Sequence, residues 1–136
     1  MDDILNDCKI IFAFTGGVAG WLFGGFDSLI YALIAFAALD YATGVLLAIR
    51  EKKLSSEIGF QGICKKVMIF VLVAVGHVID QYVIGTGSSL RTMLILFYLT
   101  NEGISIIENA GAIGLPLPQK LKDAIKQLSQ NPPVQK

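Results

Sequence analysis

Charged side chains are scarce in this sequence of 136 residues. They make up 16% of the chain, whereas a soluble domain carries about 25%, and the few present are bunched rather than spread. The hydrophobic fraction is 54% and the mean hydropathy is +0.63. This composition argues against a soluble globular domain. The formal net charge is zero, so bulk charge favours neither nucleic acid nor another polyanion as a partner.

Residues that carry chemistry are also few. The chain has one histidine, His77, and two cysteines, Cys8 and Cys64, with no spacing typical of a metal site. It contains no phosphate-binding Gly-Lys-Ser loop and no Ser-His-Asp candidate outside the apolar segments. We therefore expect no enzymatic activity, no metal and no cofactor, and a membrane-embedded enzyme is a disfavoured alternative. The N-terminus begins Met1-Asp2-Asp3, acidic where a signal peptide is basic, so no cleavable signal peptide is expected.

What the sequence does have is long apolar segments. A helix needs about 20 apolar residues to cross a bilayer, and four segments approach or exceed that length: 10–26, 28–49, 67–84 and 90–107. They predict an all-α fold, a small polytopic membrane protein with three or four transmembrane helices within residues 1–117. The first segment is short and glycine-rich and has an interfacial alternative. The fourth is interrupted by polar residues and has a re-entrant or interfacial alternative.

A basic segment separates the second and third apolar segments and predicts the orientation of the chain. It is predicted as a loop over 50–66, and its positive residues are Arg50, Lys52, Lys53, Lys65 and Lys66. Short loops rich in Lys and Arg normally stay on the cytoplasmic side. With four crossings both termini are cytoplasmic, and with three the N-terminal segment lies outside. The alternative is a solvated turn between helices of a soluble protein.

Three glycines in the first segment recur every four residues: Gly16, Gly20 and Gly24. Residues at this spacing share one face of a helix. In a bilayer, small residues at this spacing let two helix backbones approach closely. We interpret this face as a packing or oligomerisation surface, within one protomer or between protomers.

Polar residues interrupt the apolar segments and are predicted to lie inside the membrane. They are Asp40, His77, Asp80, Asn101 and Glu102. A rise of about 1.5 Å per residue predicts that Asp40, His77 and the Asn101–Glu102 pair lie at similar depth. Either these groups hydrogen-bond helices to one another, or they line an ion or proton path or a water-filled lumen. The sequence leaves both hypotheses open.

The C-terminal part, 118–136, is predicted to be a cytoplasmic amphipathic tail. Leu121, Ala124, Ile125 and Leu128 follow the i, i+3, i+4, i+7 pattern of one helix face. Three lysines are placed to meet anionic lipid headgroups: Lys120, Lys122 and Lys126.

Several stretches in order along the chain resemble one family. They are Leu39-Asp40-Tyr41-Ala42-Thr43-Gly44, then Lys53-Leu54-Ser55-Ser56 with Gly59, Gly62 and Lys65-Lys66, then Asp80, then Asn101-Glu102-Gly103-Ile104-Ser105-Ile106-Ile107-Glu108-Asn109, and finally Gly114-Leu115-Pro116-Leu117-Pro118 with Lys120-Leu121. The series covers roughly 39–128 and resembles the toxin-secretion and phage-lysis holins of bacteriophages that infect Gram-positive bacteria.

The resemblance implies a function. A holin would oligomerise in the host cytoplasmic membrane and form lesions that release an endolysin or a toxin, with lipid, further copies and an antiholin as its partners. A small ion or proton channel and an antiholin-type regulatory protein are the alternatives.

Overall fold

The structure is a computed structural model of the chain, and it describes residues 1–130. Within these residues every regular element is a helix and no strand occurs. The elements in order are α1 (Asp2–Phe23), α2 (Ser28–Arg50), α3 (Ser56–Val78), the π-helix η1 (Ile79–Ile84), α4 (Ser89–Ile113) and α5 (Gln119–Gln130). The predicted all-α fold is confirmed.

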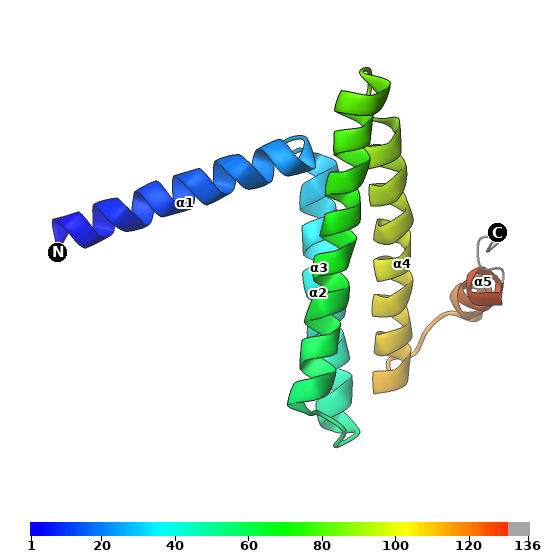
Figure 1. Ribbon diagram of the computed structural model, residues 1–136. Helices are drawn as coiled ribbons and strands as arrows, with labels where there is room; N and C mark the ends of the chain where they lie inside the picture. The colour runs from blue at the N-terminus through cyan, green and yellow to red at the C-terminus, as the bar shows by residue number, and fades with distance from the viewer. Residues whose placement is uncertain (131–136) are drawn as a thin grey trace.

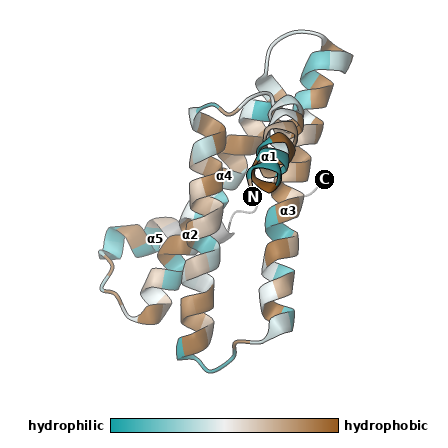
Figure 2. Cartoon of the chain, turned by 90° about the vertical axis from the view of Figure 1, so that its left-hand side faces the viewer, coloured by the Kyte–Doolittle hydropathy of each residue, from teal (hydrophilic) through white to brown (hydrophobic). Residues whose placement is uncertain are grey.

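Three long helices form a bundle (Figure 1). α3 continues into η1 and lies beside α2 and α4, and the small core between them consists of Ile30, Leu33, Ile69, Val73 and Ile95. The helices of the bundle consist largely of hydrophobic residues (Figure 2), and many of their large apolar side chains are exposed on the outside. Such an apolar surface is suited to contact with lipid, because exposing hydrocarbon to lipid tails does not carry the free-energy cost of exposing it to water.

Three helical stretches are long and apolar enough to cross a membrane: Ser28–Arg50, Ser56–Ile84 and Ser89–Ile113. The chain is therefore a small polytopic membrane protein. α1 is not among these stretches, buries none of its residues and extends away from the bundle at a steep angle (Figure 1). This arrangement favours the three-crossing alternative, while a spanning segment at 10–26 stays a prediction.

The predicted loop over 50–66 is wrong in its second half. The Ser55 hydroxyl accepts a hydrogen bond from the backbone N–H of Ile58 at 3.2 Å and so caps α3, because an N-cap side chain satisfies a free amide of the first turn. The helix therefore begins at Ser56, and Lys65 and Lys66 are helical. Only the short connection between Arg50 and Ser56 is a loop.

The fourth helix is longer than the predicted 90–107. Asn101 and Glu102 lie in the interior of α4, because polar side chains interrupt the hydropathy pattern without breaking backbone hydrogen bonds. The helix ends at Gly114, whose φ of 109° suits glycine.

The C-terminal tail contains α5, which crosses the direction of the bundle (Figure 2). Leu121 is half-buried. The side chains of Ile125 and Leu128, and all of 131–136, lie outside the described residues. The division into a membrane domain at 1–117 and a tail at 118–136 stays a prediction.

Candidate functional site

A cluster of charged side chains joins the three helices of the bundle. The Lys66 ammonium of α3 donates hydrogen bonds to the carboxylates of Asp40 on α2 and Glu102 on α4, forming an ion pair with each. The side chains of Lys66, Asp40 and Glu102 are 19%, 12% and 8% exposed. We call these three residues the ion cluster. One side chain from each helix therefore meets inside the bundle.

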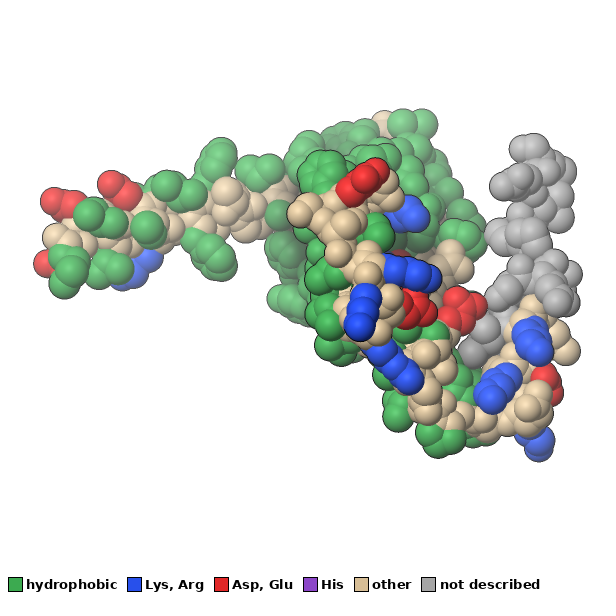
Figure 3. Space-filling view, turned by 90° about the horizontal axis from the view of Figure 1, so that it is seen from below, with side chains coloured by type: hydrophobic (Ala, Val, Ile, Leu, Met, Phe, Trp, Pro, Cys, Tyr) green, Lys and Arg blue, Asp and Glu red, His purple; other side chains and the backbone are tan. Residues whose placement is uncertain are grey.

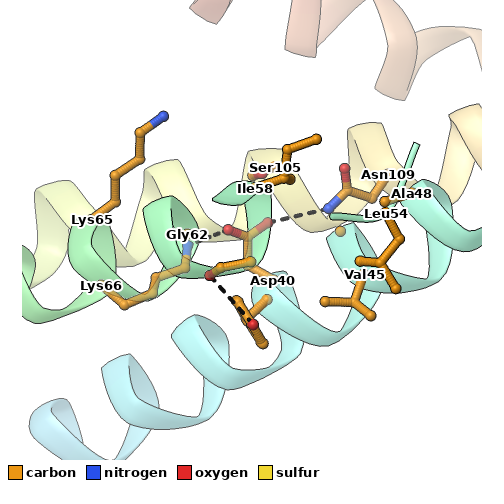
Figure 4. Close-up of a pocket in the computed structure, with 13 residues that line it drawn as sticks. Asp40, Val45, Ala48, Leu54, Ile58, Gly62, Lys65, Lys66, Ser105 and Asn109 are labelled. Carbon is orange, nitrogen blue, oxygen red and sulfur yellow. Dashed lines mark hydrogen bonds and ion pairs between the residues drawn. The ribbon is translucent and has the colours of Figure 1, made fainter. Parts of the chain in front are cut away.

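Two further polar residues complete the surroundings of Asp40. The Asn109 amide on α4 donates to Asp40 Oδ1 at 3.3 Å and to Thr43 Oγ1 at 3.0 Å. The Thr43 hydroxyl donates in turn to the backbone carbonyl of Asp40 at 3.0 Å. Both carboxylate oxygens of Asp40 are thus hydrogen-bonded, one to Lys66 and one to Asn109 (Figure 4).

The position of α3 explains how Lys66 reaches its partners. Lys66 is ten residues after Ser56, and Asp40 is ten residues before Arg50. Since α2 and α3 run in opposite directions from one short loop, equal counts place these residues side by side.

A cavity of about 240 Å³ adjoins the ion cluster on the side of the α2–α3 loop. Asp40, Lys66 and Asn109 lie at its polar part, and apolar side chains such as Val45 and Leu54 line the rest. The Tyr41 hydroxyl donates to the Gly59 carbonyl at 3.4 Å. A Cβ at Gly62 would lie 3.2 Å from the Tyr41 ring, so glycine at this position lets α3 approach α2.

The ion cluster places one ammonium between two carboxylates. Withdrawing any one of the three groups leaves a charge without its partner, which is costly in a low-dielectric interior. The cluster therefore stabilises the bundle only while all three helices are together. The ion cluster therefore joins the three helices through side-chain ion pairs. In the described residues no group of three His, Cys, Asp or Glu side chains is placed to hold a metal ion.

A second polar cluster lies at the opposite end of the bundle. The Arg91 guanidinium on α4 donates to both carboxylate oxygens of Asp27, at 2.8 and 3.0 Å, to the Gly25 carbonyl at 3.3 Å and to the Phe23 carbonyl. We call Arg91, Asp27 and these two carbonyls the arginine clamp. The Arg91 hydrogen bonds hold the pKa of the Asp27 carboxyl below its usual value of 3.8. The clamp fixes the turn from α1 into α2.

Asp80 and His77 belong to this second end. The Asp80 carboxylate accepts hydrogen bonds from the backbone N–H groups of Leu90 at 3.1 Å and Arg91 at 2.9 Å, in the first turn of α4. His77 lies against Gly24, where a Cβ would come 2.5 Å from His77 Nδ1. The prediction that His77 shares the depth of Asp40 is therefore wrong.

The glycine series does not form one helix face. Gly24 is the left-handed C-cap of α1, with φ 76°, so it terminates the helix instead of extending the face. No neighbouring atom lies within 4 Å of a Cβ placed at Gly16, and the Phe26 ring lies 3.5 Å from one placed at Gly20. An oligomerisation role for Gly16 and Gly20 stays a prediction.

The basic residues of the predicted loop separate into two groups. Four of them are exposed: Arg50, Lys52, Lys53 and Lys65. Lys66 alone turns inward, to the ion cluster. Viewed along the bundle from the loop end, the basic side chains gather over the loop and α5 (Figure 3).

Sequence reasoning missed three residues that complete these clusters: Asp27, Thr43 and Asn109. A signal for Asp27 was available, because an Asp two residues after a Gly-Gly pair and directly before an apolar run is typical of an N-cap. Nothing in the spacing indicated that Asn109 lies opposite Asp40.

Comparison with known proteins agrees with this architecture. The bacteriophage holin family matches residues 17–130, so the chain belongs to that family, as the motif series predicts. It is a holin-like membrane protein with three membrane-capable helices.

The relatives match most of the chain. An uncharacterized 14.9 kDa protein in the nagH 3′ region of Clostridium perfringens is 41% identical over 129 residues, 95% of this chain and 98% of that protein. The uncharacterized protein Lin0175 of Listeria innocua is 44% identical over 110 residues, 81% of this chain and 78% of that protein. The uncharacterized protein YtkC of Bacillus subtilis is 32% identical over 121 residues, covering 87% and 90%. No solved structure matches the chain.

Proposed function

We propose that this protein is a phage holin. It accumulates in the cytoplasmic membrane of a host bacterium, oligomerises and opens lesions through which an endolysin, or a toxin, leaves the cytoplasm. The observation that carries the proposal is family membership over residues 17–130, in a chain whose described part is a three-helix apolar bundle.

The ion cluster supplies a mechanism for assembly. While Lys66 pairs with Asp40 and Glu102 of its own chain, the polar groups are satisfied inside one protomer. If the helices separate, the same groups need new partners, because hydrocarbon offers none. Neighbouring copies supply identical groups at the same depth. The cluster therefore favours two states, a closed protomer and an assembly.

The charge distribution supports the orientation. The four exposed basic residues of the α2–α3 connection and its neighbouring helix turns lie at the loop end of the bundle (Figure 3). By the positive-inside rule this end faces the cytoplasm. α1 then lies at the outer surface.

A small ion or proton channel is the second candidate. It is favoured by the carboxylates of the ion cluster and by the cavity of about 240 Å³ beside them. A channel conducts ions without passing a protein, and an antiholin binds a holin without killing cells by itself. These differences separate the three functions.

The test is inducible expression in a bacterium that carries a cytoplasmic endolysin. Membrane potential, viability and optical density are recorded together. For a holin we expect sudden depolarisation, followed by lysis only when the endolysin is present. Depolarisation without endolysin escape favours the channel, and no effect favours the antiholin.

A matched pair of variants tests the role of the charge. Asp40→Asn changes the ion cluster, and Asp7→Asn makes the same change at an exposed position of α1. A charged path predicts that only Asp40→Asn alters depolarisation. Unchanged behaviour of both variants rejects the charged path and leaves the holin proposal intact.

A further inference from the structure

Asn101 lies at the centre of a membrane-capable helix, where an unpaired polar side chain has its highest free-energy cost. It is the middle residue of α4 (Ser89–Ile113), which is one of the three membrane-capable helices. Its side chain is exposed and makes no hydrogen bond to any described residue. The neighbouring Thr100 is also exposed, but its hydroxyl donates to the Leu96 carbonyl at 2.8 Å. Asn101 is therefore left with unsatisfied donors and acceptors at the depth of the lipid tails.

The surface around Asn101 is a groove between α3 and α4. Its volume is about 610 Å³, and it combines a polar set with an apolar set of side chains. The polar set includes Lys65, Asn101, Glu102 and Ser105, and the apolar set includes Met68 and Leu72. α1 leaves the bundle on the side away from α4 (Figure 1). The groove is therefore open to a neighbour in the plane of the membrane.

The chemistry of the amide indicates what fills the groove. Lipid tails cannot hydrogen-bond, so they leave the Asn101 amide unsatisfied. An amide both donates and accepts, so a second amide satisfies it. A two-fold axis along the membrane normal brings the same residue of two copies to the same depth, in a self-complementary contact.

We propose that the α3–α4 groove is the contact surface between two copies of this chain, with Asn101 of each copy hydrogen-bonded to Asn101 of the other across a two-fold axis. This inference rests on the proposed holin function and identifies the face through which assembly begins.

Cross-linking in native membranes tests the geometry. The exposed native cysteines are first removed with Cys8→Ser and Cys64→Ser, and Asn101→Cys is then compared with Leu96→Cys. Leu96 is an exposed residue of the same helix, and about 100° per residue places it on a different face. Copper phenanthroline oxidises two thiols to a disulfide and accepts their two electrons. We expect Asn101→Cys to form the disulfide-linked dimer at least about tenfold faster than Leu96→Cys, because a disulfide needs Cα atoms within about 7 Å. Equal rates, or a faster Leu96→Cys reaction, overturn the proposal.

A second measurement tests the amide itself. The association constant of the purified full chain in detergent micelles is measured by sedimentation for the native sequence, for Asn101→Leu and for Thr100→Leu. We expect Asn101→Leu to weaken association by about three- to tenfold and Thr100→Leu to leave it unchanged, since Thr100 is satisfied within its own helix. Native association of Asn101→Leu overturns the proposal.

The two proposals fail separately. Lysis with intact timing but no Asn101→Cys cross-link rejects this contact surface alone. Efficient cross-linking of a chain that neither depolarises cells nor releases an endolysin rejects the holin function and keeps the contact.

Discussion

The two polar clusters of the bundle contain similar groups but differ in their partners and in their location along the helices. The arginine clamp uses one guanidinium against one carboxylate and two backbone carbonyls, at the turn where α1 meets α2. The ion cluster uses one ammonium against two carboxylates, in the interior of three membrane-capable helices. The clamp is balanced in formal charge and lies at a helix end. The cluster is unbalanced and lies within the helices.

This difference assigns different roles to the two ends. The clamp satisfies backbone carbonyls that the end of α1 leaves free, so it holds a turn in one shape. The cluster holds separate helices together and becomes unfavourable when any one of them leaves. The clamp therefore fixes a turn within the chain, and the ion cluster joins three separate helices.

Removing the cation of the ion cluster has the largest expected effect. Lys66→Met leaves Asp40 and Glu102 facing each other without a cation, and we expect a loss of about 3–5 kcal/mol in the free energy of unfolding. Thermal unfolding in detergent micelles measures it. Lys65→Met, one residue along α3 and exposed, is the control and should change little. Equal stability of the two variants would show that the cluster does not hold the helices together.

Replacing the arginine of the clamp has an intermediate effect. Arg91→Lys keeps the charge but loses the planar fork that reaches Asp27 and two carbonyls at once. We expect a loss of about 2 kcal/mol and faster proteolysis between Gly24 and Asp27. Limited proteolysis with mass mapping measures the cleavage rate, and Arg50→Lys at an exposed position is the control. Cleavage of Arg91→Lys at the native rate would show that Arg91 does not hold the turn between α1 and α2.

Lowering the pH should weaken the clamp by a smaller amount. The Arg91 hydrogen bonds lower the pKa of Asp27 in the folded chain below its usual 3.8. The stability from this carboxylate is therefore complete above about pH 4 and is lost as the pH falls through the lowered pKa. The effect is small because the Asp27 side chain is 48% exposed.

The comparison that isolates this effect uses Asp27→Asn. The difference in melting temperature between the native chain and Asp27→Asn should narrow between pH 6 and pH 3. Asp7→Asn, on the exposed part of α1, should show no such narrowing. A difference that stays constant over this pH range contradicts the assignment.

The sequence predicted the helices better than the contacts between them. Apolar length predicted that the second, third and fourth helices exist, but not that the third begins at Ser56 or that the fourth continues to Ile113. The ion cluster could not be predicted while 50–66 was interpreted as a loop, since Lys66 was then placed in solvent. With Ser55 recognised as an N-cap, equal counts from the loop bring Lys66 opposite Asp40.

The same counting explains the error at His77. His77 is 21 residues after Ser56, and Asp40 is ten residues before Arg50. At about 1.5 Å per residue the two lie roughly 16 Å apart along the bundle. The contacts of Arg91 show the same limit, because Asp80 accepts a hydrogen bond from the Arg91 backbone N–H while the Arg91 guanidinium extends to Asp27. Which partner a long side chain selects depends on neighbouring helix ends, and hydropathy does not contain that information.

The steep angle between α1 and the bundle has a consequence for crowding. A helix of 22 residues is about 33 Å long, and α1 projects sideways from the end of the bundle at the α1–α2 turn (Figure 1). An arm of that length rotating with its bundle sweeps an area about ten times that of a bundle roughly 20 Å across. Copies therefore begin to collide at a much lower surface density than compact bundles would. The length of the projecting helix therefore determines the surface density at which copies in the membrane first come into contact.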